Sequence, residues 1–160
     1  MNNNMIYVTS ASDHTLVINR PEIPLNKVWR KRGQKLPIDR EQLTMAFYTL
    51  GVETLFRQGK LVTDDETFLK DVGLMDEDGV KAVEPVSEET MKRMISVMPV
   101  SDFKVHLNKM TESQKQEFAT YAVEHYKELK NDRIDLISKA VHKDIFKTIV
   151  NYKESQEEEL

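Results

Sequence analysis

The sequence predicts an α+β fold, in which a small N-terminal β-hairpin sheet with helices is followed by an all-helical C-terminal bundle. Short β-prone runs fill the first forty residues, and apolar residues at helical spacing dominate afterwards. An acidic segment containing Gly79 and Pro85 separates the two patterns. We therefore expect an α+β domain over 1–74, a linker over 75–86, a helical domain over 87–153 and a frayed acidic tail over 154–160.

The first pair of expected strands is Ile6–Thr9 and Thr15–Ile18. Both runs are rich in β-branched residues, and the small polar residues Ser10–Asp13 between them are typical of a turn. Pro21 and Pro24 then close the pair, because proline cannot donate a hydrogen bond to a strand ladder. The pattern predicts a hairpin made of these two strands.

A second hairpin is predicted over Lys27–Lys31 and Lys35–Ile38, with its turn around Gly33. The first of these strands alternates Val28 and Arg30 with Trp29 and Lys31. This places the indole of Trp29 on a strongly basic hairpin.

Capping patterns mark the helices of the first domain. Asp39 with Gln42 predicts a helix start, and Thr63 with Glu66 predicts another. Glycines then end or bend these helices. The first helix carries one apolar face, which consists of Leu43, Ala46, Phe47 and Leu50.

Past residue 86 the chain reads as consecutive helices. Ser87 and Thr111 are expected N-caps, the latter with Gln114 in a capping box. A methionine stripe at helical spacing is interpreted as core, with docking into a partner groove as the alternative. Its members are Met91, Met94 and Met98.

Composition narrows the classes of protein that fit. The 160 residues are 39% hydrophobic and 31% charged, contain no cysteine and carry a net charge of -4. Disulfide scaffolds and thiolate metal sites are excluded, and no apolar stretch has the roughly 18 residues of a membrane span. The N-terminus lacks the basic and apolar regions of a signal peptide. We therefore expect a soluble intracellular protein with no membrane partner and no secretion by a signal peptide.

No motif points to catalysis, a metal or a cofactor. The four histidines are scattered, the five glycines have no phosphate-loop spacing, and no Gly-x-Ser-x-Gly element occurs. The adjacent acidic pairs Asp64-Asp65 and Glu88-Glu89 lie at helix starts, where capping explains them. The sequence therefore predicts a protein that is not an enzyme and has no catalytic residues, metal site or cofactor.

Charge is divided along the chain. Residues 20–40 hold seven basic side chains against two acidic ones, and residues 64–89 hold ten acidic against two basic. The basic hairpin has three interpretations: solvated charges protecting a sheet edge, a protein contact, or a phosphate contact with Trp29 stacking on a base. The contact candidates are Lys27, Trp29, Arg30, Lys31, Arg32 and Lys35. Asp76, Glu77 and Asp78 are the candidate acidic residues for such a contact, in which the basic hairpin of one copy would meet the acidic segment of another.

The order of several weak motifs resembles a group of small, poorly characterised proteins of tailed bacteriophages, often encoded among virion structural genes. The motifs are Tyr7-x-Thr9, Ile23-Pro24-Leu25, the basic strand ending at Gly33, the capped helix Ile38–Leu43, Gly51-x-x-x-Leu55 and the helical run 111–153. Members of the group tend to have Pro-Gly-Gly where this chain has Thr49-Leu50-Gly51. The resemblance implies a structural or assembly role and a location in the virion or the host cytoplasm, and it supplies no catalytic residue.

These observations predict a non-catalytic phage virion structural or assembly protein that acts by protein contact. Its expected partner is a larger structural protein of the particle, together with further copies of itself. The first alternative is a nucleic-acid-binding regulator with a winged-helix-like N-terminal part. The second is a phage factor that binds a host protein.

Overall fold

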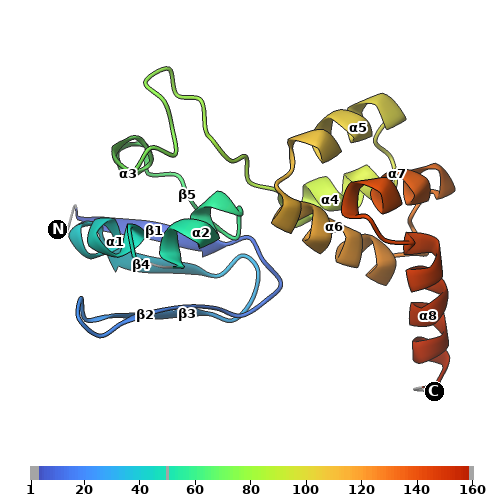
Figure 1. Ribbon diagram of the computed structural model, residues 1–160, viewed down its shortest axis with the longest axis horizontal. Coiled ribbons are helices and arrows are strands. Elements are labelled where there is room, and N and C mark those ends of the chain that lie inside the picture. Colours follow the sequence, from blue (N-terminus) through green and yellow to red (C-terminus); the bar gives the residue numbers. More distant parts are fainter. Residues whose placement is uncertain (1–3, 50, 159–160) are drawn as a thin grey trace. The chain divides into compact units, whose positions relative to one another are not determined.

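The computed structural model describes residues 4–49 and 51–158, and the chain divides into two compact units, 1–85 and 86–160. The protein is α+β, as predicted, with antiparallel strands followed by helices (Figure 1). The first unit contains β1 (Met5–Ser10), β2 (Leu16–Arg20), β3 (Leu25–Trp29), β4 (Lys35–Asp39), α1 (Arg40–Phe47), α2 (Val52–Arg57), β5 (Leu61–Thr63) and α3 (Glu66–Asp71). The second contains α4 (Glu88–Ile95), α5 (Val100–Lys109), α6 (Glu112–Glu124), α7 (Asn131–Val141) and α8 (Ile145–Glu158).

The strands β1 to β4 overlap the predicted runs, although β3 spans Leu25–Trp29 where Lys27–Lys31 was expected, and their pairing differs from the prediction. Both predicted hairpins are wrong, because β1 pairs with β4 and β5 while β2 pairs with β3. The four-residue turn 21–24 connects β2 to β3, so Pro21 and Pro24 form the hairpin turn instead of ending a hairpin. Figure 1 shows β2 and β3 as a separate strand pair running alongside β1 and β4. The local sequence shows where a strand forms, whereas the strand with which it pairs depends on which distant residues are buried together with it.

The core of the first unit is continuous across both sheets and the three helices named above. Ile6 and Val8 of β1 point into it, while Tyr7 between them faces solvent. Trp29 of β3 is fully buried, and its indole N–H donates to the carbonyl oxygen of Val8 at 3.0 Å. This bond ties the β2–β3 pair to β1 without a strand ladder.

The N-cap of α1 is the predicted Asp39, whereas α3 is capped by Asp65 and not by the predicted Thr63, which belongs to β5. Asp39 accepts from the Gln42 N–H at the start of α1, and Asp65 accepts from the Phe68 N–H at the start of α3. The expected face of α1 is buried at Leu43, Ala46 and Phe47. Leu50, expected on the same face, lies outside the described residues.

The second unit has its own core, and the methionine stripe belongs to it. Met91, Met94 and Met98 are buried, as the core interpretation predicts. Arg133 of α7 is also buried, with the guanidinium donating to the carbonyl oxygens of Met94 and Met98. These carbonyls lie at and just beyond the end of α4, where unpaired acceptors and the helix dipole favour a cation. The ring of Phe103 lies 5.2 Å from the guanidinium carbon.

Two predicted boundaries differ from the structure. The segment 75–85, expected to be part of a linker, lies within the first unit, because Met75 is buried and the Ala82 N–H donates to Leu74. The expected frayed tail is also different, since α8 continues to Glu158. Its glutamate and glutamine residues are good helix formers, which explains the extension.

Candidate interaction site

Three loops meet at one end of the first unit. They are the β1–β2 loop, the β3–β4 loop and the turn between α2 and β5 (Figure 1). Ser10 donates to Gln34 and accepts from the Gly33 N–H, while the Ala11 N–H donates to the Lys60 carbonyl. These bonds, of 2.8 to 2.9 Å, extend β1 beyond its ladders on both sides. We call this place the basic loop end.

The basic loop end carries unpaired positive charge. Arg30, Lys31 and Lys35 are exposed there, and Lys60 is half-buried. None of these four makes an ion pair within the described part of the chain. Like-charged neighbours in one small area raise the local potential, which attracts an acidic surface.

The β3–β4 loop has a defined shape. The Arg30 N–H donates to the Gln34 side-chain oxygen at 2.7 Å, and the Gln34 N–H donates to the Lys31 carbonyl. Gly33 adopts φ 86°, a backbone conformation in which a residue with a side chain would be strained. The Arg32 guanidinium donates to Asp13 of the neighbouring loop at 2.9 Å. Arg32 therefore fastens two loops together, whereas Arg30 and Lys31 face outward.

The remaining residues predicted for this site do not join it. Trp29 is in the core, so its predicted role as a stacking platform is wrong. Lys27 lies in the middle of β3 opposite Ile18 and is half-buried. Lys60 was missed, because nothing in a local pattern shows that the α2–β5 turn returns to the basic loops.

The predicted acidic residues form an ordered turn. The Asp76 carboxylate accepts from the Val80 N–H at 2.8 Å, and the Asp76 N–H donates to the Val80 carbonyl. Asp76, Glu77 and Asp78 are exposed at its tip. Figure 1 shows this turn at a different part of the first unit from the basic loop end. The two charged regions therefore do not neutralise each other within the unit.

A bidentate ion pair joins α1 to α3. The Arg40 guanidinium donates to both carboxylate oxygens of Asp65, at 2.9 and 2.5 Å. This hydrogen bonding lowers the pKa of Asp65 against the opposing effect of burial, and it raises the pKa of Arg40. Since Asp65 also caps α3, one carboxylate positions both helices.

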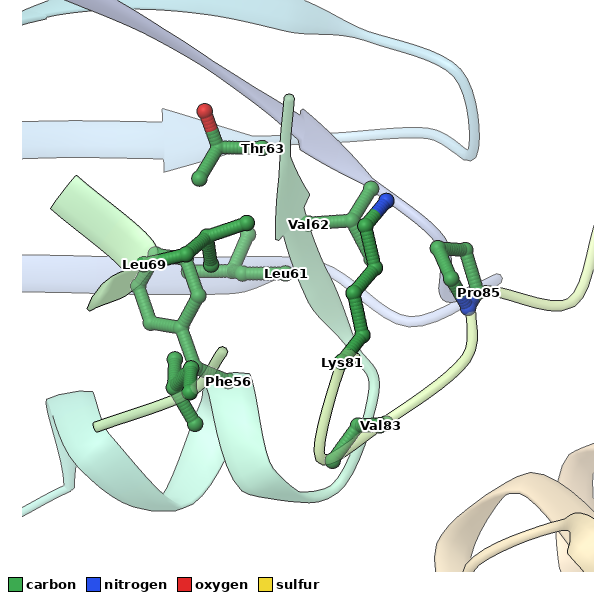
Figure 2. Close-up of a pocket in the computed structure, with 9 residues that line it drawn as sticks. Phe56, Leu61, Val62, Thr63, Leu69, Lys81, Val83 and Pro85 are labelled. Carbon is green, nitrogen blue, oxygen red and sulfur yellow. The ribbon is translucent and has the colours of Figure 1, made fainter. Parts of the chain in front are cut away.

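The first unit also has a small cavity beneath the chain segment that leads to its end. Figure 2 shows Lys81, Val83 and Pro85 of this segment near Val62 of β5, with Leu69 among the other residues that line the cavity. Its volume of about 30 Å³ is suited to a water molecule and too small for an organic ligand. We interpret the cavity as a small packing defect beneath the segment that covers it.

The second unit has a larger, open groove between α6 and α8. Ala119, Val123 and Tyr152 form much of its apolar lining, and Lys143 donates to Gln116 at its rim.

Among residues 4–49 and 51–158, no three histidine or carboxylate side chains gather in a way that could hold a metal ion. Within the same residues, no helix combines the length and apolar character needed to cross a membrane. A comparison with protein-family models found no match, and comparisons with curated proteins and solved structures found none either.

Proposed function

We propose that this protein is a non-catalytic component of a tailed-phage particle or of its assembly, and that it binds an acidic surface of a larger structural protein through the basic loop end. The phage setting rests on the sequence resemblance described above. The contact role is supported by the basic loop end, where hydrogen-bonded loops hold four cations that make no ion pair among the described residues. These are Arg30, Lys31, Lys35 and Lys60.

The geometry favours a protein partner over a nucleic acid. The burial of Trp29 removes the aromatic platform on which a base would stack. The short helices of this unit also lack a basic face, since Arg57 of α2 pairs with Glu53 and α3 carries Glu66 and Asp71 beside Lys70. A winged-helix domain that binds DNA needs a basic recognition helix. Charges held on fixed loops suit recognition of one complementary protein surface.

Sedimentation of nuclease-treated particles from the source culture tests the setting. The proposal predicts that the chain cosediments with capsid and tail proteins in a fixed ratio, measured by quantitative mass spectrometry. Recovery only in the soluble fraction would overturn the particle role and favour the host-binding alternative.

A charge-reversed variant tests the site itself. Arg30→Glu with Lys31→Glu should remove incorporation into particles, because both side chains point away from the fold. Lys70→Glu with Lys104→Glu makes the same change in net charge at two exposed lysines elsewhere and should incorporate normally. Equal incorporation of both variants would contradict the proposed contact. Duplex binding by the unaltered chain that steepens as salt falls, and is lost in the first variant, would favour the nucleic-acid alternative.

A further inference from the structure

Two surfaces of opposite charge lie on the first unit. One is the basic loop end, whose four cations make no ion pair within the described part of the chain. The other, which we call the acidic turn, is the exposed tip formed by Asp76, Glu77 and Asp78. These three carboxylates make no ion pair among residues 4–49 and 51–158 either. Each surface is therefore available to a partner of opposite charge.

The acidic turn has a fixed shape. A bridge between Met75 and Lys81 closes its base, and the Met75 side chain is buried in the core of the unit. At the tip, the Asp76 carboxylate accepts from the Val80 N–H at 2.8 Å. The carboxylates are thus held in place before a partner binds, which lowers the entropic cost of a contact.

The two surfaces cannot meet within one copy. Figure 1 shows the acidic turn at a different part of the first unit from the basic loop end. The basic loops are hydrogen-bonded to the end of β1, and the acidic turn is anchored through Met75. Since both surfaces belong to the same compact unit, neither reaches the other without unfolding. A contact between them therefore requires two copies.

The acidic turn complements the basic loop end better than the acidic end of α8 does. No basic residue occurs between Lys70 and Lys81, so the carboxylates of the turn form a concentrated negative charge. In α8, by contrast, Glu154 directly follows Lys153, and the glutamates are spread along the helix. A compact cluster of one sign gives the stronger local potential.

We propose that copies of this chain associate head to tail, with the acidic turn of one copy bound to the basic loop end of the next. The inference rests on the proposed function, because it uses the same basic loop end and names a second copy as one of its partners. The two surfaces differ, so the contact is heterologous and builds a row of copies. The copy at one end of the row keeps its basic loop end free for the larger protein.

The contact is small, because few side chains of each copy take part. Exposed ion pairs contribute little in water, so we expect a dissociation constant on the order of 0.1–1 mM at low ionic strength. Salt should weaken the association, because charges on both surfaces are screened. Copies held side by side on a larger assembly experience effective concentrations on the order of 1 mM, where such a contact forms.

Mixing two half-blocked variants tests the arrangement by sedimentation velocity of the full chain at low ionic strength. The loop variant is Arg30→Gln with Lys31→Gln, and the turn variant is Glu77→Gln with Asp78→Asn. Asp76 stays unaltered, because its carboxylate holds the turn. Each variant alone should associate at least about tenfold more weakly than the unaltered chain. An equimolar mixture should form dimers and nothing larger, because each pair contains one intact acidic turn and one intact basic loop end.

The matched control is Glu154→Gln with Glu157→Gln, which removes the same charge from exposed residues of α8. The control should associate like the unaltered chain. The turn variant and the control both have a smaller net negative charge, so weaker association of the turn variant cannot result from repulsion between copies. An unaltered chain that stays monomeric at about 1 mM, a mixture that stays monomeric, or a loss in the control instead of the turn variant would overturn the proposal.

The outcome is distinguishable from failure of the proposed function. Association of the free chain reports on the second copy, whereas particle incorporation of Arg30→Glu with Lys31→Glu reports on the larger protein. A monomeric free chain together with lost incorporation of that variant would overturn the head-to-tail contact and leave the proposed function standing. Head-to-tail association together with unchanged incorporation would support the contact between copies and contradict the proposed function.

Discussion

The two units differ in how far apart in the sequence their stabilising contacts lie. In the first unit the Thr63 hydroxyl donates to the Tyr7 carbonyl across 56 residues, and β1 has partners on both sides far along the chain. In the second, consecutive helices, of which α4 and α6 have side-chain N-caps, bury apolar stripes that are visible in the sequence. The difference teaches that local patterns suffice for helices, whereas strand partners depend on a core that the local sequence does not show.

Each unit also contains one buried side chain that joins distant segments through hydrogen bonds. In the first it is Trp29, which donates to β1, and in the second it is Arg133, which donates to the end of α4. We infer that each core is stable by itself, so that damage to one unit leaves the other folded. Hydrogen exchange measured on peptides from each unit shows whether one unit or both have lost their protection.

The largest expected effect is in the first unit. Trp29→Ala leaves a cavity and removes the bond to Val8, so we expect a loss of about 3–5 kcal/mol in unfolding free energy. Peptides of the first unit should exchange rapidly while those of the second unit remain protected. Trp29→Phe keeps most of the volume and should cost much less. Equal loss of protection in both units would show that the units do not fold independently.

The corresponding change in the second unit is Arg133→Met. It keeps apolar bulk but leaves the carbonyls of Met94 and Met98 without their donor. We expect a loss of about 2–3 kcal/mol, confined to the second unit and measured by urea unfolding with peptide exchange. Arg133→Lys retains a donor and should be milder. A cost below about 0.5 kcal/mol would mean that water replaces the guanidinium at no loss.

The Arg40–Asp65 pair gives a smaller effect with a defined pH dependence. Asp65→Ala removes a helix cap and an ion pair, and we expect a cost of about 2 kcal/mol at pH 7. Asp65→Asn keeps a good cap and should cost about half as much. Both are measured by urea unfolding at several pH values.

The pH dependence follows from the lowered pKa of the Asp65 carboxyl. Stability from the pair is fully present above the unfolded-chain pKa of about 4 and is lost as pH falls through the lower folded value. The difference between the unaltered chain and Asp65→Asn should therefore shrink in acid. A difference that is constant from pH 7 to pH 2 would contradict this role.

The smallest stability effect is expected at the proposed contact site. Arg30→Glu with Lys31→Glu should change the unfolding free energy by less than about 0.5 kcal/mol, because both side chains are exposed and unpaired. Thermal unfolding followed by circular dichroism checks this. A marked loss of stability would mean that these residues support the fold, and a loss of binding by the variant would then need another explanation.

The sequence predicts the α+β class, the positions of the strands and several helix caps. Asp39, Ser87 and Thr111 are visible because a capping side chain and the groups it satisfies are neighbours in the chain. The strand pairing was not predictable in the same way. β1 pairs with β4 and β5, and the core that these strands share with the β2–β3 pair and the helices is assembled from residues far apart in the chain.

The candidate site was only partly predictable for a related reason. The cations Arg30, Lys31 and Lys35 could be proposed from the charge count, since they stand in one short segment. Trp29 has the same neighbours, and alternation alone does not show which side of a strand becomes core. Lys60 joins the site through a backbone bond to Ala11, which no local pattern indicates.

The most direct measurement is lysine acetylation of the chain in purified particles compared with the free chain, read by mass spectrometry. If a partner covers the basic loop end, Lys31, Lys35 and Lys60 should lose reactivity severalfold in the particle, whereas the exposed Lys70 of α3 should keep its own. Unchanged reactivity of the three loop lysines in particles that contain the chain would contradict the proposed contact.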